Sequence, residues 1–251
     1  MWYADPTAYF QRHGTEATAN ATEIYTILQG VYGWCFEAIM AALANIYAES
    51  TFNPWLWEGQ TVRAKDPNSS LYYRNFTGGY GLVQWTPYPS TPFPNTQPYI
   101  DSPNAQAMTG YAPNFSDYPG ATSDGLSQTH FLDYDIAASG NWFPCSVSYY
   151  QSYFQAVGVD ITQFRSMTVT EFKLGTFASV TPTNMVGAFE LNYLRPRNDA
   201  AAARFNSMLD EYNYWHQYFS GQPPIPPTPV IPVEWMAAFL RKKRKGGFIL
   251  R

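Results

Sequence analysis

The chain has 251 residues, of which 45% are hydrophobic, 18% aromatic and only 14% charged, so it has ample material for a folded core. Its net charge of −4 is unevenly distributed, because residues 1–240 carry nine basic and 19 acidic side chains, whereas residues 241–251 carry six basic and no acidic ones. A body with a net charge of −10 argues against nucleic acid as the main partner, while the +6 end suits any anionic surface.

Other features of the composition set weaker bounds. The many tyrosines and tryptophans are typical of a surface that faces carbohydrate, but equally of a tyrosine-rich core. Cys35 and Cys145 could form one disulfide or remain buried thiols. Residues 1–6 lack the basic start and apolar run of a secretory signal, and no apolar run reaches membrane-spanning length. The three histidines lack metal-ligand spacing, so we expect neither a metal nor another cofactor.

Taken in chain order, the sequence predicts an irregular N-terminal arm over residues 1–15 and then a mainly helical body. The predicted helices cover residues 16–29, 34–50, 126–137, 146–156, 169–175, 183–194 and 199–218. Alternating side chains at 71–76 and 80–85, separated by the Gly78-Gly79 turn, predict two short strands. The expected class is therefore α+β, mainly helical, with a small β-sheet.

Two further stretches, after the N-terminal arm, are expected to lack regular structure. Residues 86–124 are rich in proline, asparagine, serine and tyrosine, and a loop of that length predicts a functional lid or rim beside a cleft. Residues 222–232 read as an extended proline-rich linker. A basic amphipathic tail follows over 233–251, which gives a folded domain at 16–221 between the arm and the linker.

The helix that ends near Ser50 carries an acidic residue in its last turn. Apolar residues recur with helical spacing from Cys35 to Tyr47, and Asn53-Pro54 ends the pattern. Glu49 therefore combines aromatic neighbours with the negative end of a helix dipole, and both effects raise the pKa of a carboxyl group. A raised pKa suits a general acid. The alternative is a solvated glutamate near a helix end.

Four sequence blocks, in this order, carry a family resemblance. They are Asn45–Pro54, Gly78–Pro87 (Gly-Gly-Tyr-Gly-Leu-Val-Gln-Trp-Thr-Pro), Leu126–Leu132 and Phe189–Pro196. The chain resembles the phage tail lysozyme family of peptidoglycan hydrolases over about residues 20–218. More distantly, it is similar to goose-type lysozymes and lytic transglycosylases, in which a Gly-Leu-x-Gln block lines the sugar cleft.

The resemblance implies a lysozyme-like fold with Glu49 as the acid that protonates the leaving oxygen of a MurNAc–GlcNAc bond. An inverting hydrolase needs a second carboxylate roughly 6.5–9.5 Å away. Glu58 is the candidate and Asp66 the reserve. Without either one, assistance from the sugar's N-acetyl group would give an anhydro product, as in lytic transglycosylases.

The expected substrate contacts follow the same blocks. They are Ser50, Trp57, Tyr80, Gln84, Trp85, Thr86 and Tyr193. Gln84 is expected to bond to an N-acetyl or hydroxyl group, the aromatic residues to stack on sugar rings, and Thr86 to hold a water. Core packing is the alternative for Tyr80 and Trp85, and Arg195 is expected to brace acidic partners.

Two rival functions remain. Cys35 lies at a predicted helix N-terminus, where a thiol pKa is lowered, and with His130 as base it would make a cell-wall amidase or peptidase. Nothing around His130 resembles the histidine motif of such enzymes. Alternatively, the chain is an inactive glycan-binding structural protein of a virion. The expected location is the virion or the host cell wall or periplasm, after synthesis in the host cytoplasm, and residues 233–251 would contact a virion protein or an anionic membrane.

Overall fold

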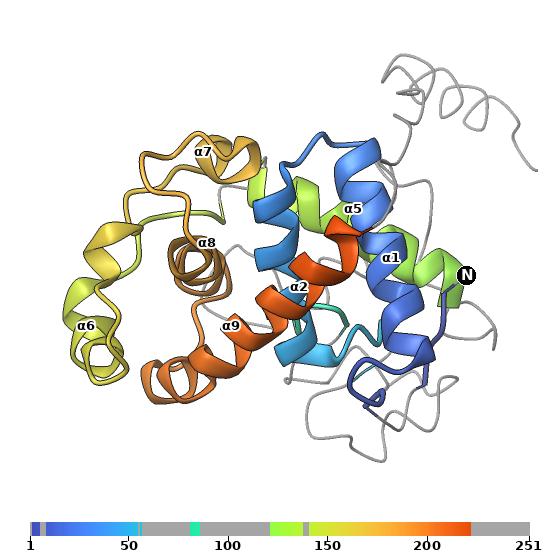
Figure 1. Cartoon of the computed structure of the whole chain (residues 1–251), viewed down its shortest axis with the longest axis horizontal. Helices are drawn as coiled ribbons and strands as arrows, with labels where there is room; N and C mark the ends of the chain where they lie inside the picture. Colours follow the sequence, from blue (N-terminus) through green and yellow to red (C-terminus); the bar gives the residue numbers. More distant parts are fainter. Residues whose placement is uncertain are drawn as a thin grey trace, which may run out of the picture.

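The computed structural model describes residues 2–5, 9–54, 56, 81–85, 121–137 and 141–221 (Figure 1). Its longer helices are α1 (Thr15–Gly30), α2 (Phe36–Ser50), α5 (Ala121–Ala137), α6 (Val147–Gln155) and α9 (Asn198–Ser220). Shorter elements are the 3₁₀ turn η3 (Ile161–Gln163), α7 (Val169–Leu174), α8 (Pro182–Ala188) and the π-helical turn η4 (Phe189–Leu194).

Helix α2 forms the centre of the fold. Every side chain from Ala38 to Ile46 is fully buried, and a helix that is buried on all sides needs neighbours on all sides. Helices α1, α7, α8, α9 and the turn η4 supply these neighbours. Figure 1 shows α9 crossing α2 along much of its length. The four alanines within this stretch let the surrounding helices approach closely.

Helix α9, which packs along α2, contributes several large side chains to the core. Its buried positions follow helical spacing, at Ala201, Ala202, Phe205, Met208, Glu211, Tyr212, Trp215 and Phe219. Phe205 and Trp215 are fully buried. Burial of an aromatic side chain of this kind stabilises the fold by about 1.5–3 kcal/mol. The same helix also presents Arg204 and Glu211 to the rest of the fold.

The N-terminal arm is irregular and packs against the end of α2. The backbone N–H of Tyr3 donates to Asn20 Oδ1 and the Asn20 amide donates to the Tyr3 carbonyl, both at 2.8 Å. Asn53 makes the equivalent pair of bonds with the backbone of Asp5. Trp2 is buried against Gly125 of α5. The arm therefore braces the segment that follows Glu49.

The helical predictions are confirmed with small shifts in their ends. Helix α5 begins at Ala121, five residues before the predicted start, so the predicted loop over 86–124 runs four residues too far. The helix predicted over 183–194 is α8 continued by the π-helical turn η4.

The small β-sheet was predicted wrongly, because no sheet is formed by the residues that the structure describes. Residues 81–84 form a turn, in which Gly81 and Gln84 have φ angles of 81° and 52°. These left-handed values are incompatible with a strand. The backbone N–H of Leu82 donates to the side chain of Gln128 at 2.8 Å rather than to a neighbouring strand. Alternation of apolar and polar residues was therefore a misleading signal here.

Several predicted segments lie outside the described residues and stay predictions. They are the first predicted strand at 71–76, the loop over 86–120, the linker at 222–232 and the tail at 233–251. In the part of the chain with described structure, no helix is both long enough and apolar enough to cross a bilayer.

Candidate active site

Glu49 lies in the last turn of α2, as predicted. The helix ends at Ser50, because Thr51 and Phe52 adopt left-handed φ angles of 51° and 66°. Left-handed backbone is uncommon for residues with bulky side chains and is held here by the surrounding structure. Phe52 is fully buried, and the backbone N–H of Thr51 donates to the Tyr47 carbonyl at 2.8 Å. The turn fixes the end of α2 and leaves the Glu49 side chain 16% exposed.

Ser50 joins α2 to the turn at residues 81–84. Its fully buried hydroxyl lies 2.8 Å from the carbonyl of Leu82 and 3.1 Å from that of Ile46. Because Ser50 follows Glu49 directly, this link places the Gly-Leu-Val-Gln block beside the end of α2, although some thirty residues separate the two segments in the sequence.

Gln84 is held by the loop on which it lies. Its side-chain nitrogen donates to the carbonyls of Leu56 and Gly81, at 3.0 and 2.9 Å. The backbone N–H of Gly81 also donates to Leu56, at 2.9 Å. Gln84 is partly exposed, so this side chain is oriented by the protein while it remains accessible from outside.

A buried glutamine from α5 clamps the same turn. The side chain of Gln128 accepts from the N–H of Leu82 at 2.8 Å and donates to the carbonyl of Pro54 at 2.7 Å. Gly81 allows this approach, since a Cβ atom at that position would lie only 2.5 Å from Gln128 Oε1. Gln128 thus ties the segment after α2 to the turn that carries Gln84.

Trp85 and Tyr193 belong to a buried network around Asp135. Asp135 is 1% exposed, and its Oδ2 accepts from Tyr193 at 2.8 Å and from Trp85 Nε1 at 3.4 Å. Asn141 donates to the other oxygen at 2.7 Å. Burial, followed by the charge of Asp135, raises the pKa of Tyr193 well above its usual range, so its hydroxyl remains a donor. The polar ends of both aromatic residues therefore point to Asp135.

Arg204 of α9 lies between two carboxylates. Its Nη2 is 2.5 Å from Glu49 Oε1 and its Nε is 2.9 Å from Glu190 Oε1. The side chain of Arg204 is 25% exposed, whereas Glu190, in η4, is completely buried. The second carboxylate oxygen of Glu190 has no hydrogen-bond partner within the described structure. We call Glu49, Glu190 and Arg204 the charge cluster.

Burial dominates the electrostatics of the charge cluster. Desolvation raises the pKa of Glu190 to about 7, with the Arg204 cation acting against this rise and the Glu49 charge adding to it. Desolvation disfavours the Arg204 cation as well, but the two carboxylates outweigh it and raise the pKa of Arg204 above its usual value. Arg204 is therefore a permanent cation, while Glu190 titrates near neutrality.

Sequence reasoning missed Arg204, Gln128 and Asp135. Glu190 lies inside a block that carried the family resemblance, but nothing in that block indicates a buried carboxyl group. The remaining predicted site residues, Trp57, Glu58, Tyr80 and Thr86, and the reserve Asp66, lie outside the described residues. Their roles stay predictions.

Comparison with known proteins places this arrangement in a family. Residues 19–208 match the family model for phage tail lysozymes. The chain belongs to the phage tail lysozyme family. The match extends from α1 into α9 and so includes Glu49, Gln84, Gln128 and the whole charge cluster.

A phage protein also matches this tail lysozyme family member over a shorter stretch. Morphogenesis protein 1 of Bacillus phage B103 is 40% identical over 72 residues, which are 29% of this chain and 16% of that protein. The match therefore covers a small part of that relative.

The structure does not favour the rival cysteine site. Burial raises the pKa of the Cys35 thiol, against the lowered value that a nucleophile needs. The thiol accepts from the N–H of Ala38 at 3.4 Å and lies 3.8 Å from the carbonyl of Phe172. His130 Nδ1 is bonded to the hydroxyl of Tyr32 at 2.6 Å. Cys35 thus acts as a helix cap, and both cysteines are free thiols.

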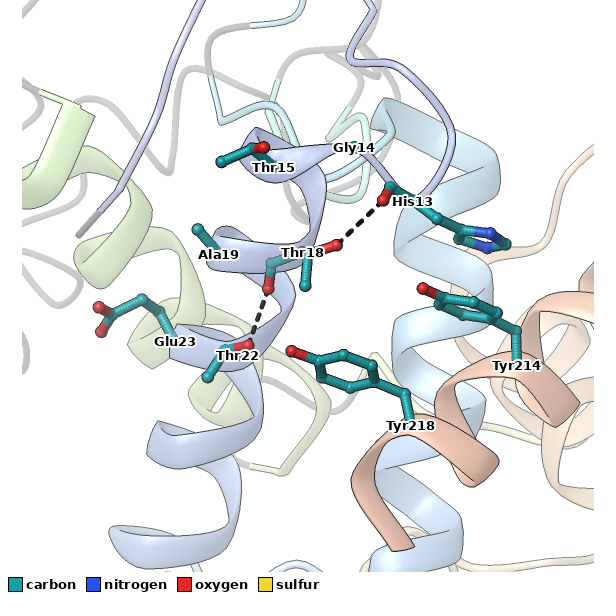
Figure 2. Close-up of a pocket in the computed structure, with 9 residues that line it drawn as sticks. All are labelled: His13, Gly14, Thr15, Thr18, Ala19, Thr22, Glu23, Tyr214 and Tyr218. Atoms are coloured by element: carbon teal, nitrogen blue, oxygen red, sulfur yellow. Dashed lines mark hydrogen bonds between the residues drawn. The ribbon is translucent and has the colours of Figure 1, made fainter. Parts of the chain in front are cut away.

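A separate pocket of about 620 Å³ lies between α1 and α9 (Figure 2). Its lining residues are His13, Gly14, Thr15, Thr18, Ala19, Thr22, Glu23, Tyr214 and Tyr218. Figure 2 shows the two tyrosines of α9 pointing toward the threonines of α1. The ring of His13 stacks on Tyr214 with 3.3 Å between centroids. None of the predicted site residues lines this pocket. Across the described residues, no group of three or more potential ligands could hold a metal ion.

Proposed function

We propose that this chain is a glycosidase that cleaves the MurNAc–GlcNAc bond of peptidoglycan, with Glu49 as the general acid. The observation that carries the proposal is the position of Glu49, at the end of a buried helix and tied through Ser50 to the turn that bears Gln84. Membership of the phage tail lysozyme family supports the same reaction. No cofactor is needed for this chemistry.

The charges beside Glu49 affect whether its carboxyl group can carry the proton that cleavage requires. Cleavage requires a proton on Glu49 for delivery to the leaving oxygen. The neighbouring Arg204 cation favours the ionised form of Glu49, whereas the charge on Glu190 opposes it. Both charges therefore act on the proton that Glu49 needs for this step.

The described contacts divide the predicted binding residues into two groups. Gln84 is oriented and partly exposed, which supports a bond from its side chain to an N-acetyl or hydroxyl group. Ser50, Trp85 and Tyr193 are buried and bonded to protein groups, so we assign them the role of shaping the turn. Stacking by Trp57 and Tyr80 and a water held by Thr86 remain part of the proposal.

The second catalytic group is Glu58 in this proposal, with Asp66 in reserve. A carboxylate on the opposite face of the sugar ring would activate water and give a reducing end. If Glu58 has no such role, the N-acetyl group of the substrate would attack instead and leave an anhydro sugar. Mass spectrometry of digested muropeptides separates the two products directly.

The decisive experiment replaces the acid. Glu49→Gln removes the transferable proton with little change in volume, and we expect less than a tenth of wild-type activity, because a positioned acid contributes roughly 10²–10⁴-fold. Peptidoglycan zymography measures the effect. Glu37→Gln, the same substitution in the first turn of the same helix, is the matched control and should remain active. A Glu49→Gln variant that retains more activity than this limit would refute the assignment.

One observation favours a second candidate function. Because Arg204 stabilises the Glu49 carboxylate, a site in which Glu49 never gains a proton would bind glycan without cleaving it. The chain would then be a glycan-binding structural protein of the virion. In that case, wild type and Glu49→Gln would both bind peptidoglycan, and neither would release muropeptides.

We also propose a place of action and one further contact. The family and the phage relative support association with the virion, from which the enzyme would reach the host cell wall. Residues 233–251 pair a short apolar stretch with a basic cluster, which suits a virion protein or an anionic membrane.

A further inference from the structure

The pocket between α1 and α9 has two walls of different chemistry (Figure 2). Thr15, Thr18 and Thr22 form one wall, because residues three and four apart share a face of a helix. Tyr214 and Tyr218 form the other wall, with their rings 17° from parallel and their centroids 6.3 Å apart. The volume of about 620 Å³ lies within the range of small-molecule sites, roughly 300–1,000 Å³.

Both walls retain hydrogen-bonding capacity for a ligand. The Thr18 hydroxyl donates to the carbonyl of His13 at 3.3 Å, and the Thr22 hydroxyl donates to that of Thr18 at 2.8 Å. A hydroxyl group has one proton and two lone pairs, so both oxygens can still accept a hydrogen bond. No hydrogen bond joins the phenol hydroxyl of Tyr214 or Tyr218 to another described residue, and Figure 2 shows both hydroxyls directed toward α1. The pocket therefore suits a ligand that carries several hydroxyl groups.

The aromatic wall is oriented by the protein before any ligand binds. His13 has a left-handed φ of 55°, and its ring is held 2.9 Å from the buried Glu211 carboxylate and stacked on Tyr214. Such backbone strain is found at ligand-binding sites. Tyr214 and Tyr218 both pack nearly perpendicular to the fully buried ring of Trp215, at centroid distances of 4.8 and 5.8 Å. Rings that are already fixed lose little freedom when a ligand binds.

The charges around the pocket favour an uncharged ligand. The described lining residues include no lysine or arginine. Of the two basic side chains at this end of α1, Arg12 lies 2.7 Å and His13 2.9 Å from the Glu211 carboxylate. A phosphate or carboxylate ligand would have to compete with Glu211 for them. A neutral sugar ring needs no cation, because its C–H face can stack on an aromatic ring while the hydroxyls at its rim form hydrogen bonds.

We propose that this pocket is a second glycan-binding site, which holds uncharged sugar rings of a peptidoglycan strand, GlcNAc above all, between the two tyrosines and the threonines. The choice of peptidoglycan as the source of these rings rests on the proposed function. Tyr214 and Tyr218 follow Arg204 by ten and 14 residues, which is about 15 and 21 Å along α9. The pocket is thus separate from the charge cluster. Contacts at both places slow the release of the protein from the cell wall, since the second contact becomes intramolecular.

The test is sedimentation of the full chain with purified, insoluble peptidoglycan, in a Glu49→Gln background so that the glycan stays intact. The double substitution Thr18→Val and Thr22→Val exchanges two hydroxyl groups for methyl groups of the same shape. We expect the affinity to fall about threefold to tenfold, because hydrogen bonds to the sugar are lost. Thr26→Val is the matched control and should bind as before. Thr26 also donates to the carbonyl four residues earlier, at 2.8 Å, but it is not among the residues that line the pocket.

The stacking wall has its own pair of variants. Tyr218→Ala removes one ring and should weaken binding by a similar factor, whereas Tyr153→Ala, at a tyrosine of α6 that is 42% exposed, should not. Unchanged affinity in the folded valine or Tyr218→Ala variants, or an equal loss in the controls, overturns the inference. Affinity that disappears when anionic polymers are stripped from the peptidoglycan also overturns it, because the ligand would then be charged.

A second measurement leaves the pocket intact. When the Glu49→Gln chain is titrated with a soluble GlcNAc oligomer, the NMR signals of the Thr18 and Thr22 methyl groups should move and saturate, while that of Thr26 stays in place. Signals of Thr18 and Thr22 that do not move up to the solubility limit of the oligomer would contradict the proposal.

The proposed function fails in a different way. If Glu49 is not the acid, Glu49→Gln still cleaves peptidoglycan, while the Thr18 and Thr22 methyl signals respond to the oligomer as expected. If only the pocket inference is wrong, Glu49→Gln is inactive and these signals do not move. With Glu49 present, the double valine variant should hydrolyse short soluble fragments at the wild-type rate. A loss there would make the pocket part of the catalytic centre and overturn its role as a separate site.

Discussion

Gly81→Ala should damage both the stability of the fold and the geometry of the candidate site. Gly81 has a φ angle of 81°, and a Cβ atom there would lie 2.5 Å from Gln128 Oε1 and 2.9 Å from its Cδ. The end of a glutamine side chain usually moves aside easily. Gln128 is fully buried and bonded at both ends, to Leu82 and to Pro54, so its displacement breaks two hydrogen bonds.

The expected loss has two parts. Left-handed backbone costs a residue with a Cβ atom about 1–2 kcal/mol relative to glycine. Displacing Gln128 leaves the buried N–H of Leu82 without its acceptor, and an unsatisfied buried donor costs about a further 1–3 kcal/mol. The free energy of unfolding should therefore fall by about 2–5 kcal/mol. Because Gln84 lies on the same turn, activity on peptidoglycan should fall as well.

Gly158→Ala is the matched control, and urea unfolding is the measurement. Gly158 has a similar φ of 78°, but a Cβ atom added there would meet no other atom within 4 Å, so it shares the backbone strain and lacks the collision. The difference between the two variants, about 1–3 kcal/mol, isolates the clamp by Gln128. A Gly81→Ala variant that unfolds no more easily than Gly158→Ala would refute the reasoning.

Three further predictions concern the acids and the tail. Glu58→Gln should strongly reduce the release of reducing-end products; near-normal activity with anhydro products would exclude Glu58 as the base. Glu190 has a raised pKa in the fold, so its contribution to stability is full below the unfolded pKa near 4 and is lost as the pH rises through about 7. Relative to Glu190→Gln, the wild type should therefore lose on the order of 3 kcal/mol of unfolding free energy between about pH 5 and 8. Urea unfolding of both proteins measures this, and a difference between them that does not change with pH would contradict the prediction. Deletion of residues 222–251 should leave hydrolysis of soluble fragments unchanged while weakening sedimentation with virions or anionic vesicles, as raised salt also should; equal sedimentation would argue against a partner.

Helical periodicity was sufficient to predict most of the described fold. In α2 the apolar pattern and the Asn53-Pro54 stop placed Glu49 correctly in the last turn. The exact end was set by tertiary structure, because Phe52 is buried in a left-handed conformation that no local preference favours. The sequence signal identified the helix, and packing determined how the chain leaves it.

The error at residues 80–85 has a similar cause. Tyr-Gly-Leu-Val-Gln-Trp alternates like a strand, but a strand needs a neighbouring backbone to bond with. Here the N–H of Leu82 and the carbonyl of Leu82 are taken by the side chains of Gln128 and Ser50. Side-chain groups from two different helices have replaced a strand partner, and periodicity within six residues contains no information about them.

The charge cluster could not have been predicted from one sequence. Arg204 lies 155 residues from Glu49, in a helix whose pattern identifies its buried face but not the residue that this face meets. Glu190 was visible as part of Phe-Glu-Leu-Asn-Tyr, where it reads as the polar position of a helix. Its complete burial follows from the packing of η4 against α2.

The polar contacts around Glu49 divide into a rigid frame and an adjustable charge. Ser50 and Gln128 use uncharged groups that are bonded to the backbone, so they fix the turn independently of pH. Arg204 and Glu190 add a cation and a second carboxyl group whose pKa burial raises to about 7, so the charge beside Glu49 depends on pH. A substitution in the frame should therefore reduce activity and stability to a similar extent at every pH, whereas the effect of a substitution in the charge cluster on both should depend on pH.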